Sequence, residues 1–177
     1  ASMDSLRRRI VVVPQEGFLF NGTIRDNLRI AKPDASEDDI VAALRALGVF
    51  ERFAELPDGL DTEVRERGSR FSAGERQLVS LARAALVDPA VLVLDEATSN
   101  LDPGTEKEVE AALDALMRGR SVIVVAHRLT TVQRADRIAV VDHARIVEQG
   151  SHDELMSLAG SYARLVDAWN SAQPMRG

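Results

Sequence analysis

Acidic residues gather in the stretch VLVLDEATSNLD at 91–102. A short apolar run leads directly into Asp95 and Glu96, and a third acid, Asp102, follows a polar turn. Because open α/β sheets bind ligands at the carboxyl ends of their strands, a strand at 91–94 would present both carboxylates to a ligand. One carboxylate can hold Mg²⁺, and the next can deprotonate a water molecule for attack on a phosphate. The alternative is a strand whose terminal acids only cap the next turn, and the pair alone leaves both interpretations open.

Asp102 and His127 each have a structural alternative. Asp102 precedes Pro103, which is typical of a helix N-cap, so any chemical role would be additional. His127 follows the apolar run VIVVA at 122–126 and would stand at the end of another core strand. A lone histidine there is more often structural. At the same sheet edge as Glu96, however, a neutral imidazole could accept one hydrogen bond and donate another to phosphate or water.

Two further stretches carry polar groups next to predicted elements. FSAGERQ at 71–77 combines a hydroxyl and two small residues at the start of a long helix. Unpaired N–H groups and the helix dipole favour an anion such as phosphate there; the alternative is an ordinary N-cap at Ser72. Gln15 follows an apolar run and Pro14, so its amide could contact a metal ion, water or another protein.

The sequence contains no phosphate-binding loop of the common type. The pattern G-x-x-x-x-G-K-[ST] does not occur, and neither of the two lysines, Lys32 and Lys107, follows a glycine. The acidic stretch at 91–102 therefore stands without the element that usually cradles the phosphates of a nucleotide.

Composition excludes several classes of function. The chain has 177 residues, of which 45% are hydrophobic, and this is enough for one domain with a core. Its formal net charge of −6 gives no electrostatic footprint for nucleic acid. The absence of cysteine excludes disulfides and thiolate chemistry. The longest apolar runs, at 91–94 and 122–126, are far shorter than a membrane span.

Apolar runs and helix-end signals predict alternating strands and helices, which indicates an α/β fold. Strands are predicted at 9–13, 91–94, 121–126, 137–141 and 144–150, the last pairing with 137–141 as a hairpin or as an edge strand. Helices are predicted at 36–48, at 72–86 and from Pro103 to about 117, followed by a helical tail from 151. The helix at 36–48 has its signals in place, with Ser36 as cap, Asp39 at the capping-box distance and Gly48 at its end.

Two larger features follow from this pattern. The block from about 21 to 87 is predicted to be all helix and loop, and so to form a helical subdomain inserted between two core strands. The tail repeats large apolar side chains every three or four residues, which predicts a single stripe that packs on the core. The stripe consists of Leu155, Leu158, Tyr162, Leu165, Val166 and Trp169.

Taken together, these motifs resemble the nucleotide-binding domain of an ATP-binding cassette (ABC) transporter of the exporter type. The resemblance runs from about Leu6 to Leu165 and rests on segments in a specific order. In that order they are VPQEGFLFNGTIRDNL (the Q-loop), TEVRERG at 62–68, FSAGERQ (the signature), VLVLDEATSNLD (Walker B and D-loop), VIVVAHRL (the switch histidine) and DRIAVVDHARIVEQGSHDEL at 136–155.

The resemblance implies a role for each site residue at the sheet edge. Asp95 would be the acid associated with Mg²⁺, and Glu96 the catalytic base. His127 would sense the γ-phosphate. Gln15 would contribute to the metal site and link it to a transmembrane partner, and Asp102 would lie at a dimer interface.

The signature implies binding of ATP across a dimer. Ser72, Ala73 and Gly74 resemble the residues that close over ATP held by the opposite subunit. Two of the departures from the usual LSGGQ matter for nucleotide binding. Ala73 adds a methyl group that is tolerable only at negative φ, and Glu75 introduces an acid that a helix N-terminus tolerates locally and that is expected to point away from the nucleotide.

The resemblance also implies an architecture and partners. The fold would be a partial P-loop NTPase-like core at 3–20 and 88–177, with residues 21–87 as the helical subdomain that carries the signature. The intact protein would hydrolyse ATP with Mg²⁺ and pair with a second nucleotide-binding domain as a homo- or heterodimer. It would couple to a transmembrane domain of the same or a partner chain, at the cytoplasmic face of the membrane. No nucleic-acid partner is expected.

Because the family's phosphate loop precedes its Q-loop, the chain is expected to be a truncated domain, soluble but inactive alone. Apolar surface on the core sheet should then be uncovered. Two alternatives remain: a soluble ABC ATPase without a transport role, or a non-catalytic module that pairs with a complete cassette. The segments LFNGTIRDNL and TEVRERG count against the first, because they resemble exporter segments that face transmembrane helices.

Overall fold

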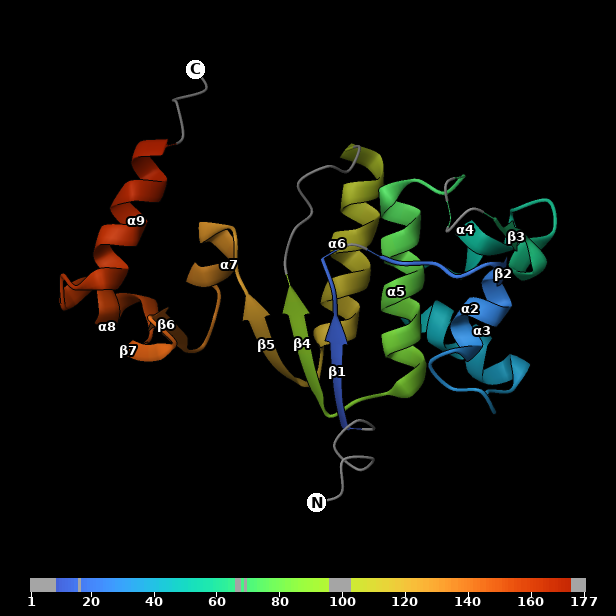
Figure 1. Cartoon of the computed structure of the whole chain (residues 1–177), viewed down its shortest axis with the longest axis horizontal. Helices are drawn as coiled ribbons and strands as arrows, with labels where there is room; N and C mark the ends of the chain where they lie inside the picture. The colour runs from blue at the N-terminus through green and yellow to red at the C-terminus, as the bar shows by residue number, and fades with distance from the viewer. Residues whose placement is uncertain (1–8, 16, 66–67, 69, 96–102, 173–177) are drawn as a thin grey trace. The chain divides into compact units, whose positions relative to one another are not determined.

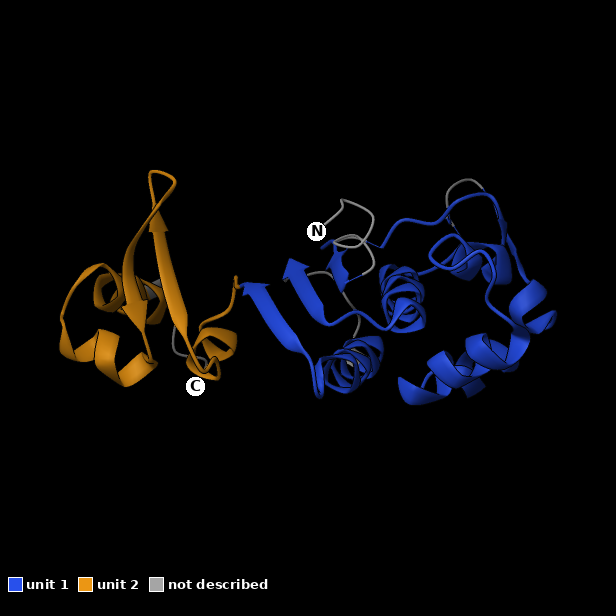
Figure 2. Cartoon of the chain, turned by 90° about the horizontal axis from the view of Figure 1, so that it is seen from below, with its two compact units in different colours: residues 1–125 blue, residues 126–177 orange. Residues whose placement is uncertain are grey.

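The computed structural model describes residues 9–15, 17–65, 68, 70–95 and 103–172. Contacts divide the chain into two compact units, residues 1–125 and 126–177, and each is described by itself (Figure 2). The first unit contains, in chain order, β1 (Ile10–Val13), β2 (Gly22–Thr23), α2 (Ile24–Arg29), α3 (Glu37–Ala46), α4 (Phe50–Ala54), the 3₁₀ turn η1 (Gly59–Asp61), β3 (Glu63–Val64), α5 (Ala73–Val87), β4 (Val91–Asp95), α6 (Pro103–Met117) and β5 (Ser121–Val125). The second contains α7 (Leu129–Gln133), β6 (Ile138–Asp142), β7 (Arg145–Gly150), α8 (His152–Ser157) and α9 (Ser161–Ala172).

Three parallel strands form the sheet of the first unit in the order β1-β4-β5 (Figure 1). Val13 pairs with Leu94, and Asp95 pairs with Val125, so the carboxyl ends of all three strands reach the same edge. The central strand, β4, is the one that delivers the predicted acids. The predicted strands at 9–13, 91–94 and 121–126 are confirmed.

Only one face of this sheet is covered among the described residues. Helices α5 and α6 pack together, and Val13, Leu92 and Leu94 lie buried in the core that they share with the sheet. On the other face, the exposed fraction is 63% for Val12 and 58% for Ile123. The expected apolar surface on the sheet is therefore present among the described residues.

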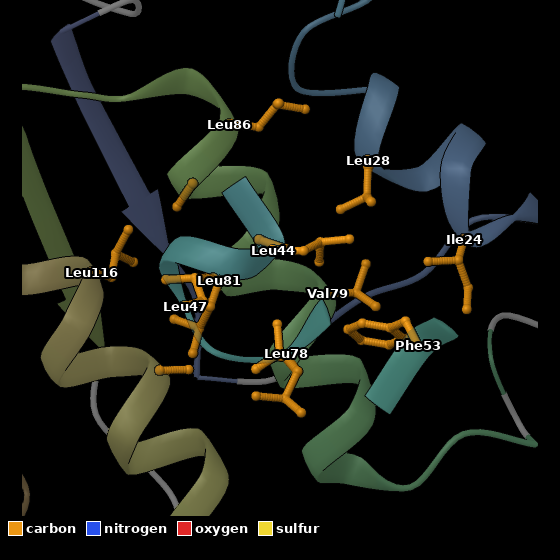
Figure 3. Close-up of a cluster of buried hydrophobic side chains, with 14 of the residues drawn as sticks. Ile24, Leu28, Leu44, Leu47, Phe53, Leu78, Val79, Leu81, Leu86 and Leu116 are labelled. Carbon is orange, nitrogen blue, oxygen red and sulfur yellow. The ribbon is translucent and has the colours of Figure 1, made fainter. Parts of the chain in front are cut away.

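Helix α5 lies at the centre of the core, surrounded by α2, α3 and α6 (Figure 3). Its fully buried side chains include Leu78, Val79 and Leu81, which face apolar side chains from the shorter helices. The helix begins at a capping box between Ser72 and Glu75, and it ends at Asp88, whose φ of 50° stops helical hydrogen bonding. The predicted helix at 72–86 is thus confirmed with both of its ends.

The block at 21–87 is not all helix and loop, so that prediction was wrong in one detail. Thr23 pairs with Glu63 in a two-residue antiparallel ladder between β2 and β3. Pairing across forty positions leaves no periodic pattern in two-residue strands, and the sequence therefore did not indicate it. The capping box of α3 at Ser36 and Asp39 is present as predicted.

The second unit is built on the predicted hairpin. Strands β6 and β7 pair antiparallel with an irregularity between Val140 and Val141. Leu155, Tyr162 and Val166 are buried against the hairpin. None of the helices in the described part of the chain is long and apolar enough to cross a membrane.

The continuous stripe predicted for the tail is corrected. Leu158 is 68% exposed, and Leu165 is also exposed. The tail forms two helices with a break at Ala159, whose φ is 49°, so the predicted positions do not share the face of one continuous helix. Ala163 is buried in the second helix beside Tyr162.

Candidate functional site

Asp95 and Gln15 follow neighbouring parallel strands. Asp95 is the last residue of β4, and Gln15 stands two residues beyond the end of β1; both side chains are exposed. Because β1 and β4 are adjacent and parallel, both residues lie at the same edge of the sheet. The structure therefore places at one edge of the sheet the two residues that were predicted as metal contacts.

The donor set at this edge fits Mg²⁺. A carboxylate from Asp95 and an amide oxygen from Gln15 are hard ligands of the kind that Mg²⁺ prefers. Among the described residues, no cluster of three or more acidic or histidine side chains forms a closed metal cage. Two protein oxygens suit an ion that keeps several waters and also binds substrate phosphates.

The remaining predicted edge residues are not placed at this site. Glu96 and Asp102 lie outside the described residues. His127 is described and exposed, but it belongs to the second unit, in the segment that follows β5. Their roles stay predictions from the sequence.

The N-terminus of α5 is capped by its own side chains, with Ser72 as the N-cap residue, and anion binding there stays a prediction. Ser72 Oγ accepts a hydrogen bond from the Glu75 N–H at 3.1 Å, and Glu75 Oε2 accepts one from the Ser72 N–H at 2.8 Å. Ala73 occupies the first helical position without a positive φ, as its methyl group requires, and Gly74 is buried. Because Ser72 Oγ uses a lone pair to accept, its hydroxyl proton is left to donate to an anion.

Glu75 also forms an ion pair that the sequence did not reveal. Its Oε1 lies 3.3 Å from Nη2 of Arg52, whose Nη1 lies 2.8 Å from Oε2 of Glu108. An arginine in the five-residue helix α4 gives no pattern in the sequence that would mark it. The unexpected acid in the signature therefore has a cation of this chain beside it.

The segment that carries Gln15 crosses α5 closely. A Cβ added to Gly17 would lie 2.2 Å from the carbonyl oxygen of Arg76, so only glycine fits there without movement. The side-chain amide of Gln77 reaches the carbonyl of Pro14 at 3.5 Å. The first two turns of the signature helix therefore fix the path of the chain just after β1.

Further along α5, Arg83 holds the same segment. Its guanidinium donates to the carbonyl of Asn27 at 2.8 Å, and Asn27 Oδ1 accepts from the Phe20 N–H at 2.8 Å. Asn27 is fully buried, and burial lowers the pKa of the Arg83 guanidinium below its ordinary value. Residues 14–27 are thus fastened to α5 at both ends.

Comparisons with known proteins point to one family. The family model described as "ABC transporter" matches residues 1–99. The chain is 48% identical, over 94% of its length, to the "Uncharacterized ABC transporter ATP-binding protein YknV" of Bacillus subtilis (strain 168), and it spans 28% of that relative. It is 47% identical over 93% of its length to the "ATP-dependent lipid A-core flippase" of Methylobacillus flagellatus, of which it spans 28%. It is also 47% identical over 93% of its length to the "Heavy metal tolerance protein" of Schizosaccharomyces pombe, of which it spans 20%.

A solved structure shows the same fold. The chain matches over its whole length a structure described as a bacterial Atm1-family ABC exporter with ATP bound, with a TM-score of 0.84 and 38% sequence identity. It covers 31% of that chain. The predicted α/β, P-loop NTPase-like fold class is confirmed by this match.

Proposed function

Because the chain belongs to the ABC transporter family, we propose that it forms part of the ATP-hydrolysing domain of a longer exporter. The observation that carries the proposal is the 48% identity to an ABC transporter ATP-binding protein over 94% of the chain. The presence of Asp95 and Gln15 at one sheet edge supports it, since this is where α/β folds bind ligands. Residues 21–87 would form the helical subdomain, and 3–20 with 88–177 the part of the core present here.

Each edge residue has one task in this proposal. Asp95 and Gln15 would hold Mg²⁺, which neutralises charge on the phosphate oxygens when it is bound. Glu96 orients and deprotonates the attacking water. His127 donates a hydrogen bond to the γ-phosphate and so holds it in place for attack by water.

The signature acts on a second nucleotide. Ser72 donates its hydroxyl proton, and the backbone at Ala73 and Gly74 donates N–H groups, to ATP held by a second nucleotide-binding domain. The dimer would be a homo- or heterodimer that buries ATP between its halves. Asp102 would lie at this interface.

Coupling to export would run through the segment after Gln15. Residues 14–27 are fastened to α5, so movement of the signature helix is transmitted to them. They would contact a transmembrane domain of the same or a partner chain at the cytoplasmic face of the membrane. Relatives of equal identity include a lipid A-core flippase and a heavy metal tolerance protein, so the shared segment favours neither substrate.

Replacement of Glu96 tests the catalytic part. In the complete protein, Glu96→Gln should abolish ATP turnover and leave Mg-ATP binding intact, because the amide cannot take the proton of water. Turnover is measured as phosphate release, and binding by equilibrium titration. Glu55→Gln, at an exposed position of α4's C-terminal end, is the control and should keep wild-type turnover. Wild-type turnover in Glu96→Gln would remove Glu96 as the base.

The two alternatives are separated by other measurements. Recovery of the complete protein from the membrane fraction supports an exporter, and recovery only from the soluble fraction supports an ABC ATPase without a transport role. A complete protein that binds a full cassette but never hydrolyses ATP would be a non-catalytic module. For the isolated chain we expect no binding of Mg-ATP, and micromolar binding would contradict the expected inactivity.

A further inference from the structure

Arg52 joins two helices that begin beside different motifs. Its Nη2 lies 3.3 Å from Oε1 of Glu75 in the first turn of α5, and its Nη1 lies 2.8 Å from Oε2 of Glu108 in α6. Helix α5 begins after Ser72, and α6 begins directly after Asp102. One guanidinium therefore links the helices that follow the signature and the D-loop.

Both carboxylate oxygens of Glu75 are engaged. Oε2 accepts the Ser72 N–H at 2.8 Å, and Oε1 pairs with Arg52. The Glu75 side chain is 25% exposed and the Arg52 side chain 33%, so solvent screens this ion pair less than a fully exposed one. Without the guanidinium, a full negative charge would stand three residues from Ser72, where the proposed function places a polyphosphate.

The environment of Arg52 indicates that its positive charge, rather than its packing, favours arginine at this position. Its Nε is buried, and no described residue accepts a hydrogen bond from it. A buried donor without an acceptor is unfavourable, so packing alone would be better served by an apolar side chain. The two acids offset this penalty, and only a cation can pair with both.

We propose that Arg52 is a positioning residue that neutralises Glu75 and holds its carboxylate over the Ser72 N–H, so that the N-terminus of α5 stays able to bind the polyphosphate of ATP. This inference rests on the proposed function and deepens it. Glu75 stands where the usual signature has glutamine. The inference identifies Arg52 as the cation that makes this acid compatible with nucleotide binding.

Kinetics of the complete protein with Mg-ATP test the inference. Arg52→Met, which removes the charge but keeps an unbranched apolar side chain, should raise the KM for ATP by about tenfold, equivalent to about 1.4 kcal/mol. The kcat at saturating ATP should change far less, because the substitution does not touch the reacting atoms. Should Arg52→Met fail to fold, Arg52→Gln replaces it with the same expectation.

A second substitution separates charge from structure. In the Arg52→Met protein, Glu75→Gln should return the KM to within about twofold of wild type, because the amide oxygen still accepts the Ser72 N–H and carries no charge. A purely structural role of Arg52 would not be rescued by removing its partner. The matched control is Arg120→Met. It breaks the ion pair with Asp88 at the C-terminal end of α5, far from Ser72, and should leave the KM unchanged.

The outcomes distinguish this inference from the proposed function. A raised KM that Glu75→Gln restores supports the inference. An unchanged KM in Arg52→Met overturns the inference, and so does a double variant that is as impaired as the single one. In either case, ATP turnover by the wild-type protein leaves the proposed function standing. Absence of turnover in the wild-type complete protein overturns the proposed function, and the inference with it.

Discussion

The two faces of the β1-β4-β5 sheet differ although their residues are equally apolar. On the covered face, Val13, Leu92 and Leu94 are buried in the core shared with α5 and α6. On the other face, Val12 and Ile123 are more than half exposed among the described residues. Apolar side chains on the buried face stabilise the folded state of this unit. Those on the second face stay exposed to water and contribute little to its stability.

The hairpin of the second unit repeats the difference on a smaller scale. Ile138 and Val140 are buried with Leu155, whereas Val141 and Ile146 are exposed. In both units, helices cover one side of a sheet whose strands carry apolar residues on both sides. Covered and uncovered positions should therefore respond differently to the same substitution.

The largest expected difference lies between two adjacent residues of β1. Val13 is 3% exposed and Val12 is 63% exposed. Val13→Lys should lower the free energy of unfolding by about 3 kcal/mol or more, because it buries an unpaired charge. Val12→Lys should change it by less than about 1 kcal/mol. Urea unfolding of the 177-residue chain measures both, and equal losses would show that the second face is covered in solution.

A smaller effect is expected at Gly17, where the chain crosses the helix of the covered face. Gly17→Ala should lower the free energy of unfolding by about 1–3 kcal/mol, since the methyl group meets the rigid carbonyl of Arg76. In the control, Gly150→Ala, the three atoms nearest to the new methyl group belong to the side chains of Glu154 and Leu155, the closest being Glu154 Oε2 at 2.9 Å. Thermal unfolding compares them, and a Gly17→Ala protein as stable as the control would contradict the close crossing.

The smallest effect concerns pH and the helix that covers the hairpin. The carboxylate of Glu148 accepts hydrogen bonds from the backbone N–H groups of Tyr162, at 2.9 Å, and Ser161, which hold its pKa below the ordinary 4.5. A lowered pKa contributes stability that is present above the unfolded-state value and lost as pH falls through the folded-state value. The attachment of α9 should therefore weaken in acid, below about pH 4.5.

Glu148→Gln tests this pH dependence. The variant should lose the part of the stability change that occurs in acid, measured as the melting temperature of the second unit between pH 7 and pH 3. The control, Asp167→Asn on the exposed side of α9, should keep the wild-type profile. An unchanged profile in Glu148→Gln would show that its carboxylate does not hold the helix.

Much of the fold and part of the site could be predicted because they depend on local patterns. Apolar runs located the strands, and the pairing of Ser36 with Asp39 located the start of α3. The sequence placed Asp95 and Gln15 each after an apolar run, and the parallel pairing of β1 with β4 puts both at one edge of the sheet. The antiparallel pairing of β2 with β3 and the break at Ala159 were missed, because neither leaves a periodic signal.

The sequence by itself determined the order of the elements, the α/β class and the chemistry available at the motifs, since helix caps, strand runs and side-chain types act within a few residues. Only the tertiary structure decided which face of each apolar run is covered. It also decided that Arg52 meets Glu75 and that Gly17 meets α5. These contacts join residues that are 23 or more positions apart, and folding alone brings such residues together.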